Sequence, residues 1–174
     1  DNLAPDATDI PENMTVECDN IPAVDAPTFT DACDTDVEVT FEQTIQDGVC
    51  TDNYVIIRKW TGVDNCGNEN IVEQQIIVQD TTNPVLETAP ADMTVECDQV
   101  PAPAELTAMD NCDTEVEVEF EEAIAEGNCA DEYIITRIWK ATDNCGNIDQ
   151  QSQVITVQDT TDPVLEGVPA DATV

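Results

Sequence analysis

The chain has 174 residues with 39 acidic and four basic side chains, and its formal net charge of −35 excludes nucleic acid and anionic membrane surfaces as partners. Hydrophobic residues make up 41% of the sequence but aromatic residues only 4%, which indicates small domains with thin aliphatic cores. Eight cysteines without a histidine or a Cys-x2-Cys pair exclude the usual zinc sites and favour disulfides in an oxidising, extracellular compartment.

Alternation of apolar and polar residues with a period of two predicts short strands and no helix. In the segment VEVTF, for example, Val37, Val39 and Phe41 are expected to face a core while Glu38 and Thr40 face water. Several short antiparallel strands separated by Pro-rich and Asp-rich turns predict a β-sandwich of the immunoglobulin or fibronectin type III kind. In chain order, the strands predicted in the first half are 14–18, 26–30, 37–41, 54–63 and 74–79.

The strand segment YVIIRKW at 54–60 recurs as YIITRIW at 133–139. It places Tyr54, Ile56, Arg58 and Trp60 on one face. An aromatic strip of this kind can bind sugars, but the favoured interpretation is that the rings fill a thin core and the arginine stacks on tryptophan or pairs with a carboxylate.

An internal repeat with one constant offset organises the chain. The cysteines at 18, 33, 50 and 66 recur at 97, 112, 129 and 145 without an insertion or a deletion, and about half of the positions in 11–80 are identical in the second copy. PADATV at 169–174 matches PADMTV at 90–95, so a third copy begins. We predict two full modules, 1–80 and 81–159, followed by the opening of a third at 160–174.

Four cysteines per module allow three pairings, and sequence alone does not choose among them. In a sandwich with the strands above, Cys18 and Cys50 lie at the end where the chain leaves the module, and Cys33 and Cys66 at the opposite end. Topology therefore predicts four bridges within modules: Cys18–Cys50, Cys33–Cys66, Cys97–Cys129 and Cys112–Cys145.

Acidic loops flank the cysteines, with DACDTD at 31–36 and DNCGN at 64–68, and their copies at 110–115 and 143–147. For any single aspartate, capping of turn amides is the favoured explanation. Four or five carboxylates in one corner repel one another unless a hard cation neutralises them, and Ca²⁺ suits oxygen ligands of this kind. We predict a structural Ca²⁺ site at or near the junction of the modules, with these candidate ligands: Asp31, Asp34, Asp64, Asp80, Asp110, Asp113, Asp143 and Asp159.

The linkers DTTNP and DTTDP contain proline and β-branched threonines but no Gly or Ser run, which predicts a stiff junction. Together with MTVECD, DxCD, Y-x-I-x-R-x-W and DNCGN, these motifs make the chain similar to the four-cysteine hyalin-repeat-like (HYR-like) domains of large bacterial surface adhesins. The resemblance covers both modules. It implies an immunoglobulin-like fold, export by a type IX secretion route, attachment at the outer membrane and a role in an adhesin stalk, including the adhesins of gliding motility.

The leading hypothesis is a structural spacer, a stiff rod bridged by disulfides and stabilised by Ca²⁺, whose partners are the neighbouring repeats of the same chain. It predicts no nucleic-acid partner and no direct membrane insertion, and it assigns any surface polysaccharide or protein ligand to other parts of the parent protein. The alternative is a polysaccharide- or protein-binding module of a secreted protein. An enzyme is disfavoured because no nucleophile and base can be assembled, and Glu121 and Glu122 lie on a strand edge without a cleft, so we expect no catalytic residue.

Overall fold

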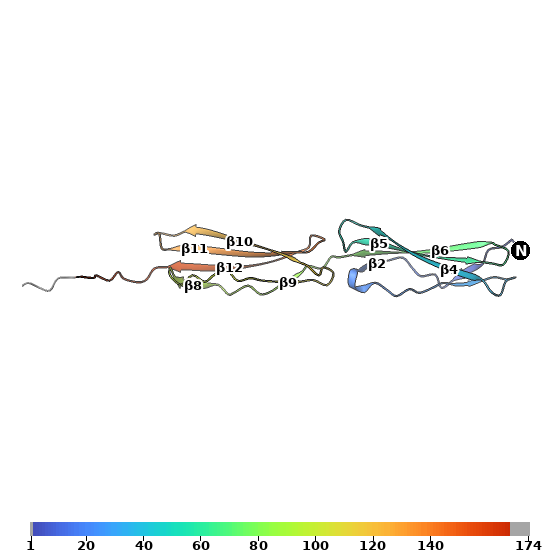
Figure 1. The fold of residues 1–174 in the computed structure, drawn as a ribbon, viewed down its shortest axis with the longest axis horizontal. Coiled ribbons are helices and arrows are strands. Elements are labelled where there is room, and N and C mark those ends of the chain that lie inside the picture. Colours follow the sequence, from blue (N-terminus) through green and yellow to red (C-terminus); the bar gives the residue numbers. More distant parts are fainter. Residues whose placement is uncertain (1, 168–174) are drawn as a thin grey trace, which may run out of the picture. The chain divides into compact units, whose positions relative to one another are not determined.

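Residues 2–167 are described by the structure, a computed structural model (Figure 1). The PADATV segment at 169–174, on which the predicted third module depends, lies outside them. Six strands lie in repeat 1 (residues 1–80): β1 (Asp6–Thr8), β2 (Met14–Glu17), β3 (Thr28–Thr30), β4 (Glu38–Asp47), β5 (Tyr54–Val63) and β6 (Glu69–Gln79). Six more lie in the described part of repeat 2 (residues 81–159): β7 (Val85–Leu86), β8 (Met93–Glu96), β9 (Ala108–Met109), β10 (Glu117–Glu126), β11 (Tyr133–Thr142) and β12 (Ile148–Gln158).

Each repeat has one four-stranded and one two-stranded sheet. In repeat 1 the order is β2-β6-β5-β4, and β1 pairs with β3 in the smaller sheet. Strands β4, β5 and β6 form an antiparallel meander, whereas β2 runs parallel to β6, with Glu17 opposite Gln79. The same orders recur as β10-β11-β12-β8 and β7-β9. The predicted all-β sandwich class is therefore confirmed, while the expectation of purely antiparallel strands is wrong at β2 and β8.

The core of repeat 1 is small and aliphatic, because the strands are short and few aromatic rings are available. Ile56, Ile76 and Val78 form its aliphatic cluster, Val16 and Tyr54 pack against this cluster, and the ring of Trp60 is buried as well. The equivalent cluster in repeat 2 contains Ile135, Ile155 and Val157.

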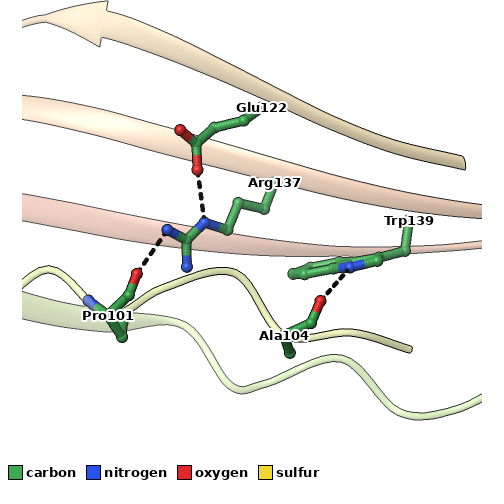
Figure 2. Close-up of polar contacts among 5 residues, drawn as sticks. All are labelled: Pro101, Ala104, Glu122, Arg137 and Trp139. Carbon is green, nitrogen blue, oxygen red and sulfur yellow. Dashed lines mark hydrogen bonds and ion pairs between the residues drawn. The ribbon is translucent and has the colours of Figure 1, made fainter.

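The predicted Tyr-x-Ile-x-Arg-x-Trp face of β11 points inward, as the core interpretation requires. Trp139 is 1% exposed, and its indole Nε1 donates to the carbonyl of Ala104 at 3.0 Å (Figure 2). The Arg137 guanidinium donates from Nε to Glu122 at 2.8 Å and from Nη2 to the carbonyl of Pro101 at 2.8 Å (Figure 2). A buried tryptophan offers no stacking surface to a sugar, so the strip is structural.

Strand β4 differs from the sequence expectation, because its apolar residues are not buried. Val39 is 47% exposed, Phe41 44% and Ile45 58%. The strand is at the edge of the larger sheet, and the two-stranded sheet β1-β3 is too short to cover its inner side. Phe41 keeps one contact with the core through the ring of Trp60, with centroids 5.3 Å apart.

The chain divides into two compact units whose limits do not follow the repeat. The larger unit consists of Asp1–Leu86, Thr107–Val118 and Ala141–Asp149. It contains all of repeat 1 and the corner of repeat 2 that carries Cys112 and Cys145.

No helix among residues 2–167 is long and apolar enough to cross a membrane.

Candidate functional site

Two disulfides within the larger unit join residues of repeat 1 to residues of repeat 2. Cys18 bonds Cys112 with a Cα–Cα distance of 5.8 Å, and Cys50 bonds Cys145 with 5.1 Å. Cys18 follows β2 and Cys50 precedes β5, so both are at the end where the chain leaves repeat 1. We call this the trailing end, and the opposite corner, which in repeat 2 carries Cys112 and Cys145, the leading end.

The predicted pairings Cys18–Cys50 and Cys112–Cys145 are therefore wrong, although each pair does lie at one end of its repeat. Cys18 follows the edge strand β2, while Cys50 is in the loop between β4 and β5, and β6 runs between β2 and β5. At least two interstrand spacings of about 4.8 Å separate them. A disulfide requires Cα atoms within about 7 Å, so a bridge along the width of the sheet does not form.

The other four cysteines, Cys33, Cys66, Cys97 and Cys129, are free and exposed, so the predicted bridges Cys33–Cys66 and Cys97–Cys129 are also absent. The loops that carry Cys33 and Cys66 do meet, because the amide of Asn65 donates to Asp34 Oδ2 at 2.8 Å. Desolvation raises the pKa of the Cys97 thiol above its ordinary value, and the carboxylates of Asp159, Asp131 and Asp98 raise it further.

The DNCGN hairpins are shaped by the first aspartate of each motif. Asp64 Oδ1 accepts the amides of Cys66 and Asn68 at 2.9 and 2.8 Å, and Asn68 Nδ2 donates to its Oδ2 at 2.6 Å. Hydrogen bonding by the Asn68 side chain is the main reason why the pKa of Asp64 is below its ordinary value. Gly67 has φ of 87°, a left-handed conformation that disfavours residues with a Cβ.

In repeat 2 the same hairpin makes further contacts with repeat 1 inside the larger unit. Asn144 Nδ2 donates to Asp52 Oδ2 at 2.7 Å, and Asn147 Nδ2 donates to the main-chain carbonyl of Asp80 at 3.3 Å. Cys145, between these two asparagines, forms the disulfide with Cys50. The hairpin therefore holds its own turn with the aspartate and reaches repeat 1 with the asparagines and the cysteine.

The linker that follows β6 is also fixed to repeat 1. The amide of Thr81 donates to Glu17 at 3.0 Å and its hydroxyl donates to the same carboxylate at 2.8 Å. These bonds lower the pKa of Glu17, the backbone bond contributing most. After repeat 2, Thr160 contacts Glu96 in the same way, with its amide at 3.0 Å.

Two predicted metal ligands meet beside the Cys18–Cys112 bridge. Carboxylate oxygens of Asp80 and Asp110 and the sulfur of Cys112 lie within 4.8 Å of one another. Asp80 is 6% exposed, and its Oδ2 and that of Asp110 are buried without a hydrogen-bond partner. Because Cys112 is in a disulfide, its sulfur is no thiolate ligand, so the candidate donors are the two carboxylates.

Burial raises the pKa of Asp80 above its ordinary value. The backbone bond from Thr82 opposes this shift, while the charges of Asp110, Asp143 and Asp52 increase it. A buried carboxylate next to other carboxylates is the arrangement that a cation or a proton would stabilise.

Like the Oδ1 atoms of Asp80 and Asp110, the other predicted ligands accept hydrogen bonds from nearby backbone amides, as the turn-capping explanation expects. Asp113 accepts from the amides of Glu115 and Asn144, and Asp143 from those of Cys145 and Asn147. Asp31, Asp34 and Asp159 accept amides in the same manner. Sequence reasoning did not distinguish Asp80 and Asp110 from these residues, because an unpartnered buried oxygen has no sequence signal.

Comparison with known proteins matches one of the two repeats to a family and finds solved structures with a distant likeness. Residues 85–157 match the family model described as "HYR-like domain with 4 cysteines". No curated protein matches the chain.

Drosophila N-cadherin EC1-4 is similar with 13% identity and a TM-score of 0.39, over 91% of this chain and 50% of that one. Human protocadherin-24 EC1-2 has 13% identity and a TM-score of 0.34, over 92% and 100% of the two chains. The Ig1-2 module of the Drosophila receptor protein tyrosine phosphatase DLAR has 10% identity and a TM-score of 0.31, over 90% and 100%.

The chain spans about half the length of the N-cadherin fragment, and likenesses this distant add nothing to the strand topology described above. The family match is of another kind, because it covers residues 85–157 of repeat 2 with all four of its cysteines. Repeat 2 therefore belongs to the HYR-like domains with four cysteines, and repeat 1 is its near copy.

Proposed function

We propose that this chain is a stalk segment of a large extracellular bacterial adhesin, in which consecutive HYR-like repeats form a stiff rod for surface adhesion or gliding. The observation that carries the proposal is the pair of disulfides between repeat 1 and repeat 2. A single disulfide lets the joined segments rotate about its own bonds. Two disulfides at different points of one junction restrain this rotation. A junction restrained in this way transmits force along the chain.

The linker contacts support the same role. Glu17 holds Thr81 through its amide and its hydroxyl, and Asn147 contacts the carbonyl of Asp80. The residues between β6 and β7 are therefore bound to both repeats within the larger unit. A spacer needs this property, whereas a flexible tether lacks it.

Calcium is the cation that we propose for the Asp80–Asp110 pair. The two buried, unpartnered oxygens are hard donors of the type that Ca²⁺ prefers, and the chain's negative charge attracts cations generally. When bound, Ca²⁺ would neutralise the buried charge of Asp80, whose pKa is raised first by burial and then by the neighbouring carboxylates. We expect it to add stiffness to a junction that the disulfides already define.

The compartment follows from the same bonds. Disulfides persist in oxidising environments outside the cytoplasm, so the bridged chain fits an extracellular location. We propose, from the adhesin resemblance, that it is exported and held at the cell surface, and that a ligand such as a polysaccharide binds elsewhere on the parent protein. Glu122, one of the two carboxylates considered for catalysis, is paired with Arg137, and we propose no enzymatic activity.

Small-angle scattering tests the stiff junction. We expect the pair-distance distribution of the oxidised chain to fit one conformation with one maximum dimension. After reduction with a phosphine, we expect it to require a broad range of conformations. The Cys33→Ser/Cys66→Ser variant is the matched control, because it removes two thiols and leaves the junction intact. Equally broad distributions before and after reduction would show that the bridges do not stiffen the chain and would refute the proposal.

A further inference from the structure

The four free cysteines occupy the same positions, one repeat away, as the four bonded ones. Cys97 and Cys129 are the copies of Cys18 and Cys50 at the trailing end. Cys33 and Cys66 are the copies of Cys112 and Cys145 at the leading end. All four free thiols are exposed. Each therefore has a counterpart in the same chain whose bonding partner is known.

The polar groups of the junction are present at the open ends as well. Asp131 is the copy of Asp52, the residue that receives Asn144. At the leading end of repeat 1, Asn65 and Asn68 are the copies of Asn144 and Asn147. Both halves of the junction thus recur with their hydrogen-bonding groups, and neither half has been replaced by a capping sequence.

The trailing-end loop has one turn hydrogen bond in common with and without a bridge. In repeat 2 the β10–β11 loop is closed by bonds from Gly127 to Glu132 at 2.8 Å and from Glu132 to Cys129 at 3.2 Å. In repeat 1 the equivalent amide of Asn53 donates to Cys50 at 3.2 Å. An open hollow of about 610 Å³ includes Cys129, and a hollow at the equivalent loop includes Cys50. The turn that follows the cysteine is therefore present both at the bridged end and at the open end.

We propose that the trailing end of repeat 2 docks on, and is bridged to, the leading end of another copy of this repeat. Cys97 bonds the cysteine at the position of Cys112, and Cys129 bonds the one at the position of Cys145. Cys33 and Cys66 accept the trailing end of a further copy in the same way. Because the contact joins unlike ends, it does not close on itself, and every added copy presents a new pair of thiols.

The chemistry needs an external oxidant, for which we assign a low-molecular-weight disulfide such as oxidised glutathione. A protein thiolate first attacks the glutathione disulfide, forming a mixed disulfide and releasing one glutathione thiolate. The second protein thiolate then attacks the mixed disulfide, and the second glutathione leaves. In total, two protein thiols and one glutathione disulfide give one protein disulfide and two molecules of glutathione. Each added copy needs two such exchanges.

The test compares the 174-residue chain with a chain lengthened by one repeat, made by duplicating residues 81–159. Both are oxidised in a glutathione buffer, and their free thiols are counted after denaturation at a pH that blocks exchange. Bonded peptides are then identified by mass spectrometry. In the monomeric fraction of each oxidised chain, isolated by gel filtration, the inference predicts four free thiols, with the number of bridges rising from two to four. Molecules that couple end to end have fewer free thiols and carry bridges from Cys97 to Cys33 and from Cys129 to Cys66 of the next copy.

The new bridges are expected from Cys97 and Cys129 to the duplicated copies of Cys112 and Cys145. Eight free thiols in the lengthened chain would mean that the ends do not couple, and would overturn the inference. Bonded peptides that join two cysteines of the same repeat would overturn it equally. Neither result depends on stiffness, so both are separate from the scattering test of the proposed function.

A single substitution checks the register. In the lengthened chain, Cys97→Ser should release one thiol, identified as the duplicated copy of Cys112, while the bridge from Cys129 remains. Release of any other cysteine would refute the assigned pairing. Should this variant fail to fold, the thiol count of the unaltered lengthened chain still decides the question.

Discussion

The trailing end of repeat 1 and the trailing end of repeat 2 have the same cysteines and nearly the same loops, yet only the first is bridged. Cys18 and Cys50 are in disulfides, whereas Cys97 and Cys129 are free. Glu17 and Glu96 nevertheless hold Thr81 and Thr160 in the same way. The comparison teaches that the bridged state is not a property of one repeat. It depends on the leading end of a following copy.

The largest expected effect is mechanical. With both bridges intact, the shortest covalent path from Cys18 to Cys145 follows the chain only as far as Cys50 and then crosses the second bridge. Reduction should release the chain that this bridge spans, a sequence separation of 95, which is about 340 Å when extended. Single-molecule pulling from the two termini, with and without reductant, measures this gain.

Two results would contradict the mechanical prediction. A gain of zero would mean that the junction is not bridged, and a much smaller gain from each repeat separately would indicate bridges within repeats. The Cys33→Ser/Cys66→Ser variant should show the same gain as the natural sequence, because both cysteines lie outside the bridges.

Removing one bridge should have the next largest effect, a loss in the free energy of unfolding. Cys18→Ser/Cys112→Ser opens a loop with a sequence separation of 94 residues, and the chain-entropy model gives a loss of about 4 to 5 kcal/mol in the free energy of unfolding. Denaturant titration of the oxidised proteins measures the loss. Cys33→Ser/Cys97→Ser removes two exposed free thiols and should leave the curve unchanged. A similar loss in both variants would show that the stabilisation does not come from the bridge.

Calcium should have a smaller effect on stability, and this effect should come from the bridged end, where Asp80 lies, and not from the open end. At a concentration ten times its dissociation constant, Ca²⁺ is expected to stabilise the chain by about 1.4 kcal/mol, observed as a rise in melting temperature above that of a chelated sample at matched ionic strength. Asp80→Asn removes a buried ligand and a buried charge. It should abolish the calcium response while raising stability in chelator.

Asp159→Asn is the matched control for calcium, because Asp159 is the copy of Asp80 at the open end, where it is exposed. We expect its calcium response to equal that of the natural sequence. If sodium chloride alone reproduces the calcium effect, or if both variants respond alike, the Asp80–Asp110 site is wrong.

Much of the fold follows from the sequence, because the two-residue alternation specifies a strand directly. The predicted strand at 54–63 agrees with β5 at both ends, and the inward face of Trp60 was expected from the same alternation. The alternation in β4 was misleading, because burial of Val39 and Phe41 also requires a covering layer, and strand patterns do not report the size of the opposite sheet.

The disulfides show a second limit of sequence reasoning. The register argument correctly placed Cys18 and Cys50 at one end, since both are near the last residues of β6. It failed at the pairing because it treated the repeat as a closed unit, whereas the partner of each cysteine is one repeat away. A fixed spacing of cysteines is compatible with bridges within one repeat and with bridges between neighbouring repeats. Only the width of the sheet, which separates Cys18 from Cys50, decides between these two pairings.

The smallest expected effect concerns the linker contact, which is the same at the bridged and open ends. Hydrogen bonds from Thr81 lower the pKa of Glu17 below its reference value of 4.5, so the charged carboxylate stabilises the folded state. This contribution is complete above pH 4.5 and is lost as the pH falls through the lower pKa of the folded state. Glu17→Gln should therefore reduce stability at neutral pH, and its difference from the natural sequence should disappear in acid.

The comparison with Glu96→Gln separates the linker contact from the bridges, because Glu96 makes the same contact with Thr160 and its pKa is lowered for the same reason. Thermal unfolding from pH 2 to pH 7 measures both variants. Glu17→Gln should loosen a linker that the two bridges also restrain, so its cost should be smaller in the oxidised chain than in the reduced one. The Glu96 variant should show no such dependence on reduction, because no bridge lies beside its linker. Equal redox dependence in both variants would mean that the disulfides and the linker contact act independently.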